Sequence, residues 1–395
     1  MMACSTEKDL CYDKFTELVT YIYPQIEKGT VVIKILLLGG YGMTGKVLAR
    51  HILAQTNASL IIAGRNFDKA KTFSDELGSP RVTPTKVDAS DQASLRSALT
   101  EVTLCLVASP TTSFTDVVAR TCLDAGVDYL DIQFAPSKLM HLRALEPEIL
   151  KAGRCFITEA GYHPGLPSVL VRYAATLMDN LEGAPIAGYL NVGKIPYTES
   201  VDELVEAFKD YDTRIYKDGA WKKSGNYGMR KFDFGSGIGK KLCYAMFFEE
   251  LHTLPDMFPS LKETGFYIAS TNLLADTFIT PFVMLGLKLF PEHGARPLGK
   301  LIWWSMTALT KPPYQVVLMI QAKGHRNGVS KKVCVRIGHS DGYELTAIPV
   351  VALLKQYIDG SARRPGLWMM GHLAEPVRLI DDMQALGATI DTVVE

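Results

Sequence analysis

The sequence predicts an α/β protein with a Rossmann doubly wound parallel sheet and a second α+β domain that contains a mixed or antiparallel sheet. Residues 33–38 form an apolar run that leads into a glycine-rich turn and then into a helical pattern. Short apolar runs then alternate with helical patterns as far as Thr158, which is typical of a parallel sheet. After Gly161 the apolar runs alternate with polar residues, as antiparallel strands do.

The glycine turn is the strongest functional motif. Gly40, Gly42 and Gly45 form a G-x-G-x-x-G pattern between a strand and a helix, the context in which the pattern binds a dinucleotide. We expect Gly40 to permit the turn, Gly42 to leave room for a pyrophosphate and Gly45 to let the helix pack closely. The alternative is a glycine-rich turn in an ordinary strand–helix unit. The predicted cofactor-binding residues of the turn are Gly40, Tyr41, Gly42, Met43, Thr44 and Gly45.

The exit of the second predicted strand, residues 59–64, favours NADP as the cofactor. An NAD site usually places an acid about 20 residues after the glycines, and Arg65 stands there instead, followed by Asn66. A guanidinium can pair with the 2′-phosphate of NADP. The alternative is that Arg65 is a solvated loop residue.

The remaining elements follow in order. We expect Asp88 to cap the third helix, and we expect Pro349 to lie in the first turn of a helix that follows a polar turn at residues 341–344. The other predicted strands cover residues 81–87, 102–108, 128–132, 155–158, 188–193, 314–321 and 333–337, and the other helices cover 15–26, 68–77, 93–99, 116–125, 139–152, 346–358 and 376–386.

Composition limits the classes of function. The 42 basic and 42 acidic residues balance, so no charge excess suggests a nucleic-acid partner. The seven cysteines are scattered without metal-ligand spacing, which predicts no metal site and a reducing, cytoplasmic environment. The polar N-terminus does not resemble a signal peptide. We therefore expect a cytoplasmic protein with a small-molecule substrate and no nucleic-acid partner.

Two segments of the second domain are unusually apolar, residues 268–290 and 301–309. Neither contains the clean run of about 18 apolar residues that a spanning helix needs. We expect helices that are buried against the second sheet or in the interface of a homodimer. Contact with a membrane surface is the less favoured alternative.

The crevice of a doubly wound sheet lies beyond the carboxyl ends of its strands. Ser109 and Pro110 end the fourth strand and are predicted to border the nicotinamide ribose. Asp131 and Gln133 follow the fifth strand, and Gly161 follows the sixth. The alternative for residues 109–111 is a simple turn that ends a strand.

Several stretches form a recognisable set, namely 39–45 (GGYGMTG) with 61–66 (IIAGRN), 128–131 (DYLD), 159–168 (EAGYHPGLPS), and 341–349 (DGYELTAIP) with 364–366 (RPG). In these stretches, from residue 31 onward, the chain resembles the saccharopine dehydrogenase-like family of NAD(P)-dependent oxidoreductases. Residues 249–255 (EELHTLP) are a further, weaker match.

The resemblance implies NADPH-dependent reduction of an imine of an amino-acid-derived substrate, or oxidation of the corresponding secondary amine. Forming the imine needs proton transfers, for which His163 and then Tyr162 are the candidate catalytic residues. The alternative for His163 is packing or hydrogen bonding within its loop. Two further alternatives are a reductase of a C=C or C=O bond in a larger apolar substrate and a non-enzymatic NADP-binding sensor.

The motifs together predict the domain organisation. A helical extension covers residues 1–30, the Rossmann NADP-binding domain covers 31–160, and a substrate and dimerisation domain covers 161–344. The family resemblance implies that a C-terminal segment, residues 345–395, returns to pack on the Rossmann domain.

Overall fold

The computed structural model describes residues 33–193, 197, 201–202, 211–225, 228–235, 237–269, 272, 275–290 and 295–395. Residues 33–395 form one compact unit. The predicted extension at residues 1–30, with its helix at 15–26, lies outside the described residues.

The first layer is a seven-stranded parallel sheet in the order β15-β6-β5-β4-β1-β2-β3. Six strands match the predicted runs, so the predicted Rossmann fold is confirmed. The strands are β1 (Lys34–Leu38), β2 (Ser59–Gly64), β3 (Val82–Lys86), β4 (Leu104–Val107), β5 (Asp128–Asp131), β6 (Cys155–Thr158) and β15 (Gly366–Met369).

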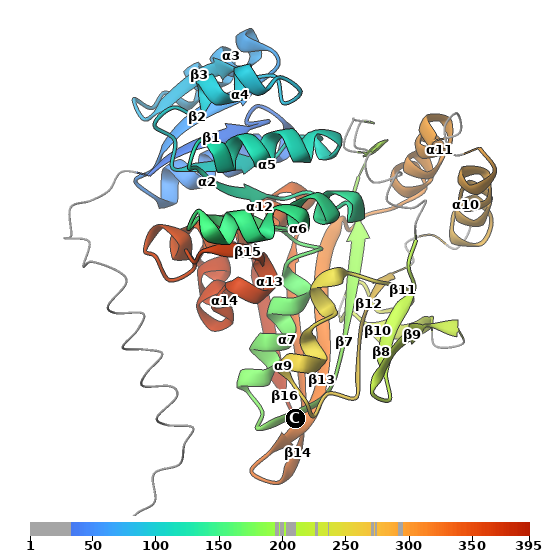
Figure 1. Cartoon of the computed structure of the whole chain (residues 1–395). Helices are drawn as coiled ribbons and strands as arrows, with labels where there is room; N and C mark the ends of the chain where they lie inside the picture. The colour runs from blue at the N-terminus through green and yellow to red at the C-terminus, as the bar shows by residue number, and fades with distance from the viewer. Residues whose placement is uncertain are drawn as a thin grey trace, which may run out of the picture. The chain divides into compact units, whose positions relative to one another are not determined.

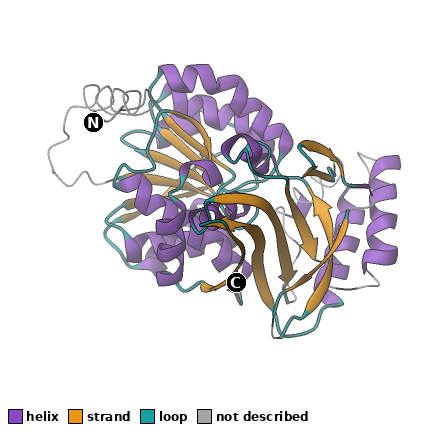
Figure 2. Cartoon of the chain, turned by 90° about the horizontal axis from the view of Figure 1, so that it is seen from below, coloured by secondary structure: helices purple, strands orange, loops and turns teal. Residues whose placement is uncertain are grey.

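Helices cover both faces of this sheet (Figures 1 and 2). Side chains alternate along β1, so Ile35 and Leu37 join one apolar core while Leu36 and Leu38 join another, as the pleat of a strand requires. The helices that follow the strands are α2 (Met43–Gln55), α3 (Phe67–Leu77), α4 (Gln92–Ala98), α5 (Thr115–Asp124), which follows the 3₁₀ turn η1 (Thr112–Phe114), and α6 (Pro136–Lys151).

The second layer is a nine-stranded mixed sheet. Its main path runs β10-β11-β12-β7-β13-β14-β16, and the β8–β9 hairpin pairs with β12. Only β12 and β7 pair in parallel, so the predicted second sheet is confirmed as the mixed type. The strands are β7 (Asn180–Asn191), β8 (Arg214–Lys217), β9 (Ala220–Lys223), β10 (Met229–Asp233), β11 (Lys240–Met246), β12 (Glu263–Ala269), β13 (Gln315–Arg326), β14 (Val329–His339) and β16 (Thr389–Val394).

The connection between the two sheets includes α7 (Leu166–Thr176), which follows β6 and precedes β7. Val169 and Leu170 of α7 are fully buried, in the same core as residues of both sheets. The 3₁₀ turn η3 (Glu249–Leu251) and the short helix α9 (Leu254–Met257) lie between β11 and β12. Because one continuous core spans the two sheets, burial of apolar side chains stabilises their packing together.

The C-terminal segment contributes to both sheets. α12 (Gly342–Ile358) packs against α2, and β15 adds a strand beside β6. Helices α13 (Met370–Leu373) and α14 (Pro376–Ala385) follow, and then β16 pairs with β14 in the second sheet. The expectation that residues 345–395 pack only on the Rossmann domain is therefore wrong for β16, whose exposed alternating residues suit the edge of a sheet.

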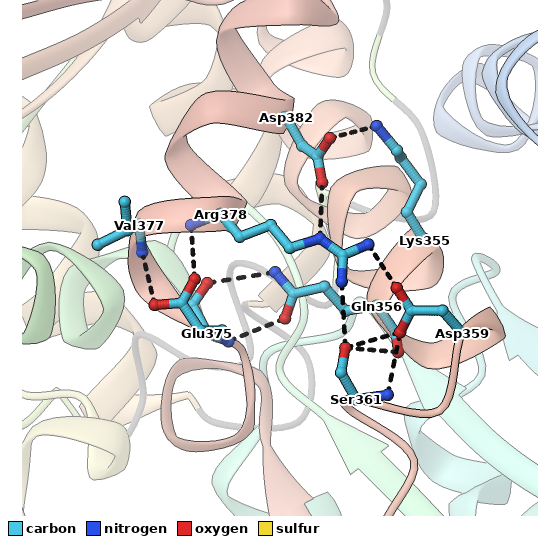
Figure 3. A network of polar contacts seen from close by, with 8 residues as sticks. All are labelled: Lys355, Gln356, Asp359, Ser361, Glu375, Val377, Arg378 and Asp382. Carbon is cyan, nitrogen blue, oxygen red and sulfur yellow. Dashed lines mark hydrogen bonds and ion pairs between the residues drawn. The ribbon is translucent and has the colours of Figure 1, made fainter.

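A polar network joins α12 to α14 (Figure 3). The buried Gln356 side chain exchanges two hydrogen bonds with the backbone of Glu375, at 2.8 and 3.2 Å. The Glu375 carboxylate caps α14 by accepting from the backbone N–H groups of Val377 and Arg378. Arg378 in turn pairs with Asp359 at 2.6 Å. These polar contacts fix the C-terminal helices against each other in addition to the apolar core that both helices join.

Two local predictions are corrected. Asp88 does not cap α4, because its carboxylate accepts from Ser90 and Asp91 is the residue that caps the helix. Asp341 caps α12 by accepting from the backbone N–H groups of Tyr343 and Glu344. The helix therefore begins at Gly342, and Pro349 lies inside it rather than in its first turn.

The apolar segments of the second domain form the turn η4 (Ala275–Ile279) and the helices α10 (Thr280–Leu289) and α11 (Ala295–Ala308). They have a small core of their own, made with Val201, and several large apolar side chains remain exposed. Within one chain these helices are therefore not fully buried against the second sheet, and their expected burial in a homodimer interface stays a prediction. None of the helices in the described part of the chain is long and apolar enough to cross a membrane.

Candidate functional site

The glycine turn lies between β1 and α2, at the carboxyl edge of the parallel sheet. The left-handed residue is Gly39, with φ of +85°, so the prediction that Gly40 makes the turn is corrected by one position. A Cβ on Gly45 would lie 2.2 Å from the Gly39 carbonyl oxygen. The first turn of α2 can therefore pack this close to the glycine turn only with a glycine at position 45. A Cβ on Gly40 would lie 3.0 Å from the Leu37 carbonyl oxygen.

The first turn of α2 suits an anion. Gly42 occupies the N-cap position, and the helix has neither a side-chain cap nor an acid in its first turn, Met43 and Thr44 included. A Cβ on Gly42 would meet only the Gly39 carbonyl oxygen, at 3.1 Å. Uncapped N–H groups and the positive end of the helix dipole attract phosphate. The residues present therefore fit the pyrophosphate of a dinucleotide.

Tyr41 connects the glycine turn to the end of β2. Its ring packs directly against Gly64, where a Cβ would lie 2.6 Å from the Tyr41 ring carbon Cε1. Its hydroxyl accepts from the backbone N–H of Asn66 at 3.0 Å. The Asn66 side chain caps α3 by accepting from the Lys69 N–H, so its predicted role in binding the cofactor competes with a structural one. Arg65 is exposed at the strand end, near enough to Asp88 to contribute to the lowered pKa of that carboxyl, for which the Ser90 hydrogen bonds are the larger cause.

The loop after β4 lies beside the glycine turn. A Cβ on Gly39 would be 2.7 Å from the Ser109 Cβ, so the two strand ends are in direct contact. The Gln133 amide donates to the Ser109 carbonyl oxygen at 2.6 Å and to the Thr111 hydroxyl at 3.2 Å. The structure therefore places Ser109 and Pro110 at the edge where the cofactor is expected, held there by Gln133.

Asp131 holds the strand ends together. Its carboxylate accepts from the Lys138 ammonium at 2.6 Å, from the Thr158 hydroxyl at 2.8 Å, and from the backbone N–H groups of Gln133 and Glu159. Asp131 and Lys138 are both fully buried. Because the Asp131 carboxylate accepts from four donors, its role is structural. The buried pair of Asp131 and Lys138 holds together the segments that follow β5 and β6.

The loop after β6 carries the predicted catalytic residues. His163 packs among the rings of Tyr162, Phe248 and Phe266, and burial lowers its pKa to about 4. Its Nε2 is buried and has no hydrogen-bond partner among the described residues. A neutral imidazole with a free nitrogen can accept a proton or a hydrogen bond from a ligand.

Tyr162 has a different environment. Its hydroxyl donates to the Val317 carbonyl oxygen of β13 at 2.9 Å, and burial raises its pKa well above the ordinary value. The hydroxyl proton of Tyr162 is therefore used in a hydrogen bond to the second sheet. Gly161 begins the loop, and a Cβ there would lie 3.4 Å from the Thr346 Cγ2 of α12.

Glu250 is the residue of this region that sequence reasoning did not select. Its carboxylate accepts from the backbone N–H groups of Gly165 at 2.7 Å and Ser168 at 3.1 Å, so it caps α7 from more than 80 residues away. Burial raises its pKa to about 8, partly opposed by the Gly165 hydrogen bond. The sequence indicated a role for Glu250 only through its position in the weakly matching stretch 249–255. No residue spacing in this stretch predicts that Glu250 caps a helix.

The chain is similar to several known proteins. Residues 35–157 match the family model described as the saccharopine dehydrogenase NADP binding domain. Carboxynorspermidine synthase of Vibrio cholerae is 26% identical over 400 residues, covering 88% of this chain and 94% of that protein. Carboxyaminopropylagmatine dehydrogenase of Synechocystis is 24% identical over 247 residues, covering 60% of this chain and 62% of that protein.

The fold has a solved counterpart. The apo saccharopine dehydrogenase (L-Glu forming) of Saccharomyces cerevisiae aligns with a TM-score of 0.65 over 91% of this chain and all of that chain, at 14% identity. Over residues 35–157 the chain therefore matches the NADP-binding domain of saccharopine dehydrogenases, and over most of its length it is similar to oxidoreductases of that type. The cofactor of the matched domain is NADP. The roles of the individual site residues stay predictions.

Proposed function

We propose that the chain reduces an imine, formed between an amine and an aldehyde, to a secondary amine, or runs the reverse oxidation. The observation that carries this proposal is the loop after β6. This loop follows a strand of the parallel sheet to which the glycine turn and the Ser109 loop also belong, and its His163 Nε2 is buried without a hydrogen-bond partner among the described residues. NADPH supplies the hydride when bound.

The chain's own residues hold the cofactor in this proposal. The backbone of residues 40–45 and the first turn of α2 bind the pyrophosphate. Arg65 pairs with the 2′-phosphate, while Ser109, Pro110 and Gly161 border the nicotinamide ribose. Asn66 contributes through its position between Tyr41 and α3, because its backbone N–H and its side-chain oxygen both form hydrogen bonds within the chain.

Proton transfer is the task that remains for the loop. When a primary amine condenses with an aldehyde to an imine, nitrogen loses two protons, and the carbonyl oxygen gains two and leaves as water. The neutral His163 Nε2 can accept one of these protons, or a hydrogen bond, from the substrate nitrogen. Tyr162 has weaker support, since its hydroxyl already donates to Val317.

The substrate class follows from the relatives. Both related proteins are named for carboxylated amines of the polyamine type, and the match to one of them covers 88% of this chain. We therefore propose a secondary amine that carries a carboxylate as the product. The exposed faces of α10 and α11 give no support to the alternative in which residues 268–309 line a pocket for an apolar substrate.

We also propose a homodimer in the cytoplasm, on the sequence pattern alone. Five of the seven cysteines lie in the described part of the chain, and all five are free thiols, four of them buried. Free thiols are typical of a reducing compartment.

The test is a screen of amines with carboxylated aldehydes, monitored as NADPH consumption and as product mass. The proposal predicts a secondary amine two hydrogens heavier than the imine. His163→Gln should lower kcat and change its pH profile while NADPH affinity is retained. A purified chain that binds NADPH but reduces only a C=C or C=O bond would contradict the proposal.

A further inference from the structure

The helix α10 has two apolar faces. Val283 and Leu287 point into the small core that α10 shares with α11 and are at most 2% exposed. On the other face three large side chains of α10, together with one from the preceding turn η4, are between 57% and 69% exposed. Their spacing of four, three and four residues places them in one continuous stripe. The stripe consists of Phe278, Phe282, Leu285 and Leu289.

A stripe of this kind differs from scattered surface residues. Single exposed apolar side chains are normal, whereas a contiguous apolar face on a soluble chain marks an interaction surface. A helix that is apolar on every side requires a second apolar neighbour. α11 supplies one, and the four-residue stripe has no counterpart among the described residues.

Positive charge accompanies the stripe. Lys288 lies in the last turn of α10 and Arg296 in the first turn of α11, and both are exposed. The two helices lie side by side (Figure 1), and a Cβ on Gly286 would lie 2.7 Å from Leu298, so these cations flank the same end of the helix pair. Lys300 lies one turn further on and is also exposed.

The exposed face of α11 continues the same composition. Arg296, Lys300 and Trp304 follow each other at four-residue spacing, and Trp304 is 51% exposed. Cations beside exposed Phe, Leu and Trp are the composition of helices that lie in a lipid interface, with rings at the headgroup level and cations against anionic headgroups.

We propose that α10 and α11 form a docking surface for an anionic lipid surface. The apolar stripe enters the boundary between headgroups and acyl chains, and Lys288, Arg296 and Lys300 bind the anionic headgroups. This binding is peripheral and requires no spanning helix. It reverses the preference that the sequence suggested for these segments, and it is independent of the proposed reaction.

The test is co-sedimentation of the full chain with vesicles of phosphatidylcholine mixed with phosphatidylserine, compared with vesicles of phosphatidylcholine alone. Wild type should sediment with the mixed vesicles and much less with the neutral ones. The double variant Phe282→Ser/Leu285→Ser should weaken binding at least about tenfold. Lys288→Gln/Arg296→Gln/Lys300→Gln should lose about fivefold per cation on the mixed vesicles only.

The control is Met140→Ser, which removes a side chain of similar exposure (68%) from α6 and should leave vesicle binding unchanged. Affinity for NADPH reports that each variant is folded. Wild type that stays in the supernatant with both vesicles would overturn the proposal. So would light scattering, without lipid, in which Phe282→Ser/Leu285→Ser converts a dimer into a monomer, because the stripe would then be a subunit interface.

Discussion

The buried cap of α7 makes stability depend on pH. Burial raises the pKa of Glu250 to about 8 from an ordinary 4.5, with the Gly165 and Ser168 hydrogen bonds opposing and the charge of Glu159 adding to the rise. A pKa that is raised in the folded state means that the folded chain holds the proton more tightly than the unfolded chain. The group therefore stabilises the fold fully below pH 4.5 and loses that contribution as the pH rises to about 8.

The size of the effect follows from the shift. A rise of this extent corresponds to about 5 kcal/mol of folding free energy between the two pH limits. Glu250→Gln cannot ionise, so its stability should lack this part of the pH dependence. Its side-chain oxygen can still accept from one of the two N–H groups, and losing the other bond should cost about 1–3 kcal/mol at low pH.

The assay is urea unfolding followed by tryptophan fluorescence from pH 5 to pH 9. The stability of wild type relative to Glu250→Gln should fall by several kcal/mol across that range, so that wild type is the more stable at low pH and the less stable at high pH. Glu249→Gln is the matched control, because Glu249 is partly exposed and pairs with Arg143 at 2.9 Å. An advantage that stays constant with pH would refute the reasoning, since it would mean that Glu250 is ionised throughout.

Three further outcomes are expected. Arg65→Ala should weaken NADPH binding by about 2 kcal/mol, roughly 30-fold, with NADH affinity unchanged. A titration in which both affinities fall equally would contradict the assignment of Arg65 to the 2′-phosphate. Gly42→Val should abolish NADPH binding in a folded chain, whereas Gly45→Ala should destabilise the fold itself, because its Cβ would meet the Gly39 carbonyl oxygen at 2.2 Å; calorimetry and thermal unfolding separate the two. Truncation after Gly342 should give insoluble protein, because it removes the buried α12 and two strands; a soluble product with normal NADPH affinity would contradict the observed packing.

The sequence was sufficient to predict six of the seven strands of the first sheet, because most of them are short apolar runs bounded by a turn, whereas β15 was missed. The switch to a mixed second sheet was also visible in the alternation after Gly161. β16 was missed because its residues are mostly exposed, so its pairing depends on the neighbouring strand and not on its own pattern. The start of α12 was misplaced because Asp341 acts as a cap, a role that a polar turn also allows.

The site was only partly predictable, for a similar reason. Gly42 and Gly45 have roles set by local backbone, which a motif encodes. Asp131 and Glu250 instead act through partners that are distant in sequence, such as Thr158 and Gly165. The exposure of the α10 stripe likewise depends on which other elements pack against it. Hydrophobic periodicity shows that a face is apolar but does not show whether another element covers it.

The most direct test of the proposed reaction is isotopic. The chain is incubated with NADPH that carries deuterium at the transferable C4 position, together with an amine and a carboxylated aldehyde, and the product is analysed by mass spectrometry. The account predicts a secondary amine with one deuterium on the carbon next to nitrogen. NADPH consumption that places the deuterium in an alcohol or in a reduced C=C bond, with no secondary amine formed, would contradict it.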